Sequence, residues 1–114
     1  MNKLIADKWV KALRSGDYTQ AIGKLQTYAG FCCLGVLCKV GELEGVYVVM
    51  RGGTKQIHGE DLYAQSDVKE WSGIKTGIGV AEVLGNNCLT GLNDGGELNF
   101  SQIADLIEEH WNEL

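Results

Sequence analysis

The chain has 114 residues, of which 45% are hydrophobic and 22% are charged, a composition that is typical of globular domains and excludes wholesale disorder. This length predicts one domain, residues 1–114, around a single core. Ten lysine and arginine residues against fifteen aspartate and glutamate residues give a net charge of -5, which argues against nucleic acid as a partner.

The N-terminal segment, residues 2–14, has the pattern of an amphipathic helix. Its apolar residues recur at helical spacing: Ile5, Trp9, Ala12 and Leu13. Asn2 is suited to cap this helix, and Gly16 is suited to the left-handed position after its end. The polar segment from Tyr18 to Gln26 has no clear period, and we expect it to be a loop.

The run GFCCLGVLC, residues 30–38, places three of the four cysteines in an apolar segment. Free cysteine behaves as a small hydrophobic residue, so we predict that Cys32, Cys33 and Cys38 are buried in the core. The apolar neighbours raise the pKa of a thiol, which argues against a nucleophile. Gly35 would let another element approach this segment closely.

A metal site and a disulfide framework are the alternatives for these cysteines. In a helix, Cys38 would face a different direction from Cys32 and Cys33. In a strand, Cys38 would lie about 20 Å from Cys32. In neither case could these cysteines share one ion. No export signal accompanies the cysteines, and neighbouring cysteines do not bridge comfortably. A zinc site of Cys38, Cys88 and His58 from separate elements remains as the metal alternative.

The middle of the chain carries a hairpin pattern and a short helix pattern. From Gly45 to His58, β-branched and aromatic residues precede Gly52-Gly53 and a second such run, which predicts a β-hairpin. Ser66 is suited to cap a short helix that continues through Trp71 and is ended by Gly73.

The C-terminal segment has the clearest helical pattern. Asn99 and Gln102 form a capping-box pair, which predicts a helix from about Phe100 to Asn112. One apolar stripe runs along it: Phe100, Ile103, Ala104, Ile107 and Trp111. We expect the last two of these residues to pack against the cysteine-rich segment. The segment before the helix, Leu92 to Gly96, is predicted to be a tight turn.

Together these elements predict an α+β domain with amphipathic helices at both ends, a buried cysteine-rich segment and a central β-hairpin or small antiparallel sheet. No apolar run reaches the roughly 18 residues that span a bilayer, and the first residues lack the apolar segment of a signal peptide. We therefore expect a cytosolic protein that does not enter a membrane.

Motifs for catalysis and cofactor binding are not matched. The segment GIKTGIG, residues 73–79, lacks the G-K-[ST] order of a phosphate-binding loop. The C-terminal helix resembles the first helix of a helix-turn-helix, but the sequence leaves no room for a recognition helix. His58 and His110 have no paired nucleophile at a recognisable spacing. We expect a protein that is not an enzyme and that binds no cofactor and no metal.

One polar constellation is a candidate binding site. The segment LRSGDYTQAIGKL, residues 13–25, contains one of only two arginines, together with an aromatic ring, an amide and an amine: Arg14, Tyr18, Gln20 and Lys24. These groups suit an anionic, nucleotide-like small molecule, over which Asn93 and Asp94 could close. The alternative is that Tyr18 packs on the core and the other residues form a solvated loop.

Three motifs resemble a family of small uncharacterised proteins of tailed bacteriophages and prophages. They are W-x3-LRSG-x-Y-x-Q (Trp9 to Gln20), the GFCCLGVLC run, and LND-x-G-x-x-x-F-x-x-IAD-x-IE (Leu92 to Glu108). The approach to Phe100 is one residue longer than is usual for that family. The resemblance implies a phage accessory protein in the cytoplasm of a bacterial host, and it implies no particular activity.

Three functions follow as hypotheses. The leading one is a phage-encoded binding protein, monomeric or homodimeric, that sequesters a nucleotide-derived signalling molecule of a host defence system. The second is an inhibitor that docks on a host protein through its acidic surface, helped by long-range attraction. The third, weaker alternative is a small hydrolase or a metal protein.

Overall fold

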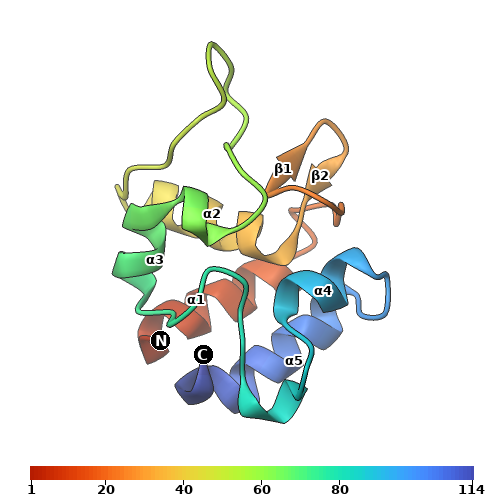
Figure 1. Cartoon of the computed structure of the whole chain (residues 1–114). Helices are drawn as coiled ribbons and strands as arrows, with labels where there is room; N and C mark the ends of the chain where they lie inside the picture. The colour runs from red at the N-terminus through yellow and green to blue at the C-terminus, as the bar shows by residue number, and fades with distance from the viewer.

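A computed structural model describes all 114 residues and contains five α-helices and one two-stranded antiparallel sheet (Figure 1). The elements are α1 (Lys3–Arg14), β1 (Gln26–Thr27), β2 (Gly30–Phe31), α2 (Cys33–Leu43), α3 (Ser66–Ser72), α4 (Leu89–Asp94) and α5 (Phe100–His110), with 3-10 helices η1 (Leu62–Ala64), η2 (Glu82–Leu84) and η3 (Trp111–Glu113). The predicted α+β class is confirmed, with helices at both ends of the chain. None of these helices has the length and apolarity needed to cross a bilayer.

The two terminal helices begin where the sequence predicts. The Asn2 side chain accepts a hydrogen bond from the Ile5 N–H at 3.1 Å, which satisfies a free donor in the first turn of α1. At the start of α5, Asn99 and Gln102 exchange backbone and side-chain hydrogen bonds, each 2.9 Å long. The α-helix ends at His110, and the predicted last turn is a 3-10 turn instead.

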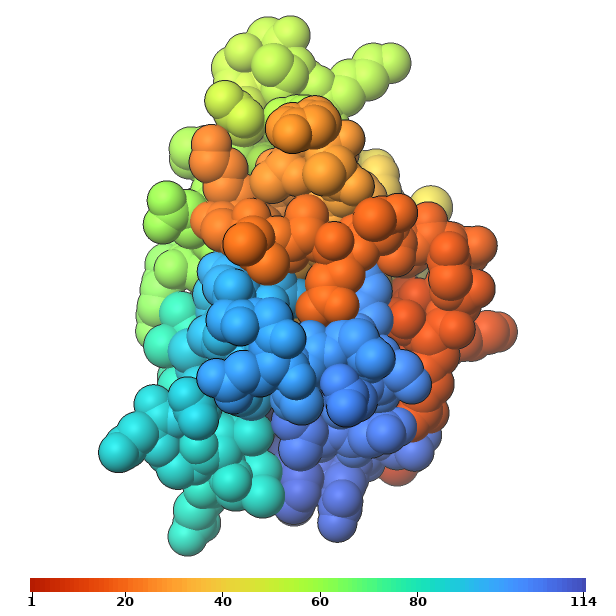
Figure 2. All heavy atoms as spheres, turned by 90° about the vertical axis from the view of Figure 1, so that its right-hand side faces the viewer, coloured from red at the N-terminus to blue at the C-terminus, as the bar shows by residue number.

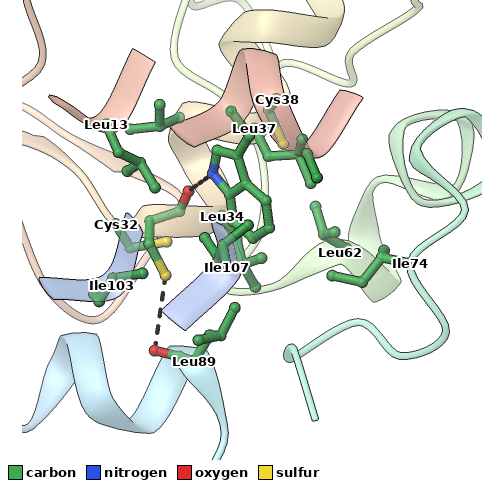
Figure 3. Packing of buried hydrophobic residues seen from close by; sticks show 14 of the residues in the cluster. Leu13, Cys32, Leu34, Leu37, Cys38, Leu62, Ile74, Leu89, Ile103 and Ile107 are labelled. Atoms are coloured by element: carbon green, nitrogen blue, oxygen red, sulfur yellow. Dashed lines mark hydrogen bonds between the residues drawn. The ribbon is translucent and has the colours of Figure 1, made fainter. Parts of the chain in front are cut away.

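The cysteine-rich segment forms α2 and the centre of the core. Cys32, Cys33 and Cys38 are buried free thiols, as predicted. The Cys32 Sγ caps α2 by accepting the Gly35 N–H at 3.4 Å. Buried side chains from several elements converge here, including Leu34, Leu62 and Ile107 (Figure 3). The core is therefore a single cluster around α2.

The stripe on α5 is buried, but its main partner is α1 rather than the cysteine-rich segment. Helices α1 and α5 pack along each other, and Ile107 lies in the shared core (Figure 1). Trp111 is only half-buried, and its carbonyl accepts a hydrogen bond from the N-terminal amine of Met1. Ile107 thus shares the core with the cysteine-rich segment, but α5 packs most extensively on α1, whose buried face includes the fully buried Trp9.

The predicted hairpin between Gly45 and His58 forms only in outline. The chain reverses around Gly52-Gly53 with a single antiparallel bridge between Met50 and Ile57, and the regular two-stranded sheet lies at β1 and β2 instead. Two backbone hydrogen bonds link the arms, from the Arg51 N–H to the Gln56 carbonyl at 2.8 Å and from the His58 N–H to the Val49 carbonyl at 2.9 Å. A buried glutamine explains the difference. The Gln65 amide bonds the N–H and C=O of Val49 and the C=O of His58, at 2.7–2.8 Å, and so takes the place of a direct bond between the Val49 N–H and the His58 carbonyl.

Two further turns differ in detail from the prediction. Ser66 is the first residue of α3 and makes no side-chain cap, whereas Gly73 ends the helix in the left-handed conformation, as predicted. The expected tight turn at Leu92 to Gly96 is mostly the end of α4. Cys88 is the N-cap of that helix, and its Sγ accepts the Gly91 N–H at 3.4 Å, as the Cys32 Sγ accepts the Gly35 N–H for α2.

Candidate functional site

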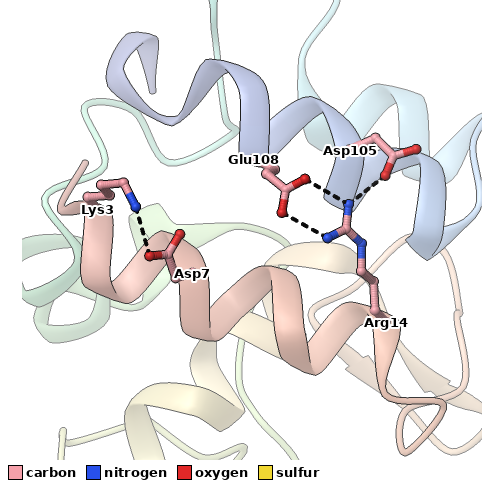
Figure 4. A network of polar contacts seen from close by, with 5 residues as sticks. All are labelled: Lys3, Asp7, Arg14, Asp105 and Glu108. Atoms are coloured by element: carbon pink, nitrogen blue, oxygen red, sulfur yellow. Dashed lines mark hydrogen bonds and ion pairs between the residues drawn. The ribbon is translucent and has the colours of Figure 1, made fainter.

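Arg14, the proposed basic group of the site, pairs with two carboxylates of α5. Its guanidinium donates to the Glu108 carboxylate at 2.9 and 3.3 Å and to Asp105 at 2.6 Å (Figure 4). The hydrogen bonds to Glu108 and Asp105 raise the pKa of Arg14 further above its ordinary value. One positive charge thus faces two negative charges, so this spot disfavours an anion and serves as a link between α1 and α5.

Gln20 and Asn93 form a structural network in which the Asn93 side chain is fully hydrogen-bonded. The Asn93 Oδ1 accepts from the Gln20 Nε2 at 2.8 Å and from the Cys33 N–H at 3.2 Å. Its Nδ2 donates to the Ala21 carbonyl at 2.9 Å and to the Asp94 carboxylate at 3.1 Å. Because all four hydrogen-bonding positions of this buried amide are used, it holds the Tyr18–Gln26 loop on α2 and α4.

Tyr18 packs on the core, which was the alternative to a role in ligand binding. Its ring meets that of Phe31 edge to face, with centroids 5.4 Å apart and planes at 89°. The same ring borders a groove between α1 and α2. Of the six predicted site residues, the structure therefore brings together Gln20, Asn93 and Asp94, while Arg14, Tyr18 and Lys24 lie apart from them in separate surroundings.

Lys24 lies on a different surface, opposite the second arginine, Arg51. Both residues line two adjoining hollows, which we call the Lys24–Arg51 cleft. One hollow measures about 310 Å³ and is lined by Ile22, Gly23, Lys24, Thr27, Tyr28, Arg51 and Gln56. The other measures about 220 Å³ and is lined by Lys24, Arg51, Ile57, His58, Gly59 and Glu60. Figure 2 shows the hairpin tip and the 21–30 segment meeting at one end of the molecule.

The two walls of the cleft are fixed to each other at the base. The Leu25 N–H donates to the Gly59 carbonyl at 3.0 Å, and the Ile57 N–H donates to the Gln26 side-chain oxygen at 2.9 Å. Leu25 and Ile57 are both buried. The base is therefore rigid, whereas the hairpin tip beyond Arg51 is exposed to solvent.

The cleft concentrates positive charge in an acidic chain. Neither Lys24 nor Arg51 takes part in any ion pair of the protein. The Arg51 guanidinium donates one hydrogen bond, to the Gln56 side-chain oxygen at 3.2 Å. Glu60 borders the second hollow without pairing with either cation. Two cations beside one cleft without carboxylate partners can bind an anionic group.

Sequence reasoning missed Arg51, Tyr28 and Gln56. The signal for Arg51 was present, because the predicted hairpin places it beside the Gly52-Gly53 turn, at an exposed tip. Nothing in the sequence indicates that Tyr28 belongs to a site, since an aromatic residue two positions before Gly30 is as well suited to the core as to an exposed surface. In the structure it lies at the β1–β2 turn and is 97% exposed.

The cysteines were the other candidates for a nucleophile or a metal site. Burial raises the pKa of the Cys32 thiol to about 11 and raises the pKa values of Cys33 and Cys38 as well, which disfavours the nucleophilic thiolate. No three His, Cys, Asp or Glu side chains are grouped so that they could hold a metal ion. The alternative zinc site of Cys38, Cys88 and His58 therefore does not form.

Comparisons with known proteins place the chain in a family. No curated protein and no solved structure matches it significantly. The model of one family, described as a domain of unknown function (DUF8296), matches residues 1–111, nearly the whole sequence. The chain therefore belongs to this family.

Proposed function

We propose that the protein is a non-enzymatic binding protein that holds an anionic, phosphate-bearing small molecule in the Lys24–Arg51 cleft. The observation that carries this proposal is the pair of cations, Lys24 and Arg51, which line the same cleft and have no carboxylate partner. A guanidinium binds a phosphate through two parallel hydrogen bonds, and a lysine amine adds a compact positive charge.

The other groups in the first hollow favour a nucleotide-like ligand. The exposed ring of Tyr28 offers a flat surface on which a base can stack, and Ile22 adds apolar area beside it. The Gln56 oxygen is bonded to Arg51, which leaves its amide N–H groups free to donate. A phosphate between the two cations and a planar ring on Tyr28 would use all of these groups.

Binding is favoured over catalysis because no activated nucleophile borders the cleft. The buried thiols lie in the core around α2, and their pKa values are raised. His58 and Glu60 line the second hollow without a hydrogen bond between them. This arrangement suits sequestration of a ligand more than its turnover.

The resemblance to small phage and prophage proteins suggests the biological setting. We propose that the protein acts in the cytoplasm of a bacterial host and sequesters a nucleotide-derived signal of a defence system. A sponge of this kind needs only affinity and abundance, which accords with a small domain whose site lies open on its surface.

Docking on a host protein is the second candidate, and one observation favours it. At the same end of the molecule, Tyr28 is 97% and Ile22 is 60% exposed beside Arg51. Tyrosine and arginine are enriched among the residues that dominate binding energy at protein interfaces. The same three side chains would then fill a pocket on the partner.

Calorimetric titration with adenosine monophosphate, pyrophosphate and adenosine tests the ligand proposal. We expect the two phosphate compounds to bind more tightly than adenosine, with an affinity that falls as salt is added. Arg51→Ala should weaken their binding roughly 10- to 150-fold, since a hydrogen bond to a charged group contributes about 1.5–3 kcal/mol. Lys55→Ala is the matched control, because Lys55 is exposed at the same tip but lies outside the cleft.

The titration also separates the two candidates. Equal loss of binding in Lys55→Ala and Arg51→Ala would contradict a defined site, because overall charge would then explain the affinity. Docking predicts instead that none of the three compounds binds. It also predicts that a host protein forms a stable complex on gel filtration, which Tyr28→Ala disrupts.

A further inference from the structure

A second surface lies in the groove between α1 and α2, away from the Lys24–Arg51 cleft. The groove measures about 310 Å³, and its apolar residues are Ala12, Tyr18, Val40 and Leu43. Leu43 is 77% exposed, so an apolar side chain projects into solvent at the edge of a hollow that is itself partly apolar. A projecting side chain and a hollow thus occur side by side on the same face.

From this arrangement we infer that the α1–α2 groove binds the same groove of a second copy of the chain. An interface with twofold symmetry must be complementary to itself, because each copy presents the same residues to the other. Here the Leu43 side chain of one copy would enter the hollow of the other, and its own hollow would receive the Leu43 of that copy. The groove thus supplies both halves of the contact.

The charges around the groove favour this partner. The charged residues that line it are Lys8, Lys11, Asp17 and Glu44. Their charges sum to zero, whereas the whole chain carries a net charge of -5. Two copies that meet at this groove therefore repel each other less than two copies that meet at an average part of their surfaces. A strongly basic or acidic partner would find no excess charge to attract it.

Two of these charges remain free for contacts between copies. Lys8 pairs with Glu44 across the groove within one chain. Lys11 and Asp17 are exposed and take part in no ion pair. A twofold contact can therefore place Lys11 of each copy against Asp17 of the other. Such a rim pair sets the register of the interface, while Leu43 supplies the apolar contact.

Sedimentation velocity from low micromolar to millimolar concentration tests this inference. The wild type should shift from monomer to dimer, and Leu43→Asp should weaken association by at least about tenfold, since a buried leucine is replaced by a charge. Leu4→Asp is the control, because Leu4 is 72% exposed on α1 but does not line the groove. Leu43→Asp should keep the wild-type melting temperature, because its side chain is exposed in the monomer.

A charge exchange makes the test specific. Lys11→Asp and Asp17→Lys should each weaken the dimer, and the double variant should restore it. A wild type that stays monomeric over the whole range would overturn the inference. So would equal loss in Leu4→Asp and Leu43→Asp, or a double variant as weak as its parents.

Discussion

Replacing Gly35 with alanine tests how α2 supports the cleft. A methyl group at this position would lie 1.8 Å from the Leu25 carbonyl oxygen, so the Leu25 backbone has to move away from the helix. That carbonyl accepts the Cys32 N–H, and the Leu25 N–H donates to Gly59 across the base of the cleft. The substitution should therefore loosen the core and the cleft together.

The expected change in the free energy of unfolding is the sum of three contributions. Overpacking costs about 1–3 kcal/mol, and the two backbone hydrogen bonds of Leu25 contribute about 1 kcal/mol each. Alanine stabilises a helix interior by about 1 kcal/mol relative to glycine. Gly35→Ala should thus lower the free energy of unfolding by about 2–4 kcal/mol, as measured by urea denaturation.

Gly91 provides the matched control because it also lies three residues after a capping cysteine. An alanine methyl there would meet only the Cys88 Sγ, at 3.5 Å, an ordinary contact. Gly91→Ala should leave stability unchanged or raise it by up to about 1 kcal/mol. Equal effects of the two substitutions, or a Gly35→Ala variant as stable as the wild type, would refute the role of close packing under Leu25.

Three further predictions concern the core and the C-terminal turn. Ile107→Ala should lower the free energy of unfolding by about 2–5 kcal/mol in urea denaturation, because Ile107 is fully buried; a smaller loss would mean that the site collapses or is not core. The three thiols of α2 should react with a thiol reagent only after unfolding, whereas the partly exposed Cys88 should react first; fast native labelling of all four would contradict this. The hydrogen bond from His110 lowers the pKa of Glu113, so the Glu113 contribution to stability is present at neutral pH and is lost as the pH falls through that lowered pKa. The melting temperatures of Glu113→Gln and wild type should therefore converge under acid conditions, and a constant difference would exclude this linkage.

The terminal helices could be predicted because their signals are local. Asn2 caps α1 three residues from its bonding partner, and Asn99 and Gln102 form their capping box within one turn. The burial of the α2 cysteines followed from their apolar neighbours. In each case the residues that decide the structure lie close together in the sequence.

The candidate site could not be predicted in the same way, because its deciding contacts are distant in sequence. In the sequence Arg14 looks like a free cation, whereas in the structure it pairs with Asp105 and Glu108 of α5. Gln20 and Asn93 look like ligand-binding amides, yet they bond each other across 73 positions. Polar residues in a loop do not reveal whether they face solvent or each other.

Arg51 shows the same difficulty in reverse. The predicted hairpin places Arg51 at an exposed tip, but its candidate role depends also on the absence of a carboxylate partner and on the position of Lys24, neither of which has a sequence pattern. The hairpin arms that carry Arg51 are held by the buried Gln65, a residue that sequence reasoning passed over. A side-chain amide that takes the place of one backbone hydrogen bond in a hairpin has no periodic signature.

Mapping where a phosphate compound binds is the most direct test of the Lys24–Arg51 cleft. Amide chemical shifts of the labelled protein, titrated with adenosine monophosphate, should change at the residues that line the two hollows, all of which lie within 22–28 and 51–60. Amides near Arg14 and Asn93 should stay unchanged, because those side chains are occupied by Glu108 and Gln20. Shifts that cluster at Arg14 and Asn93, or no shifts at the cleft at saturating ligand, would contradict binding at the Lys24–Arg51 cleft.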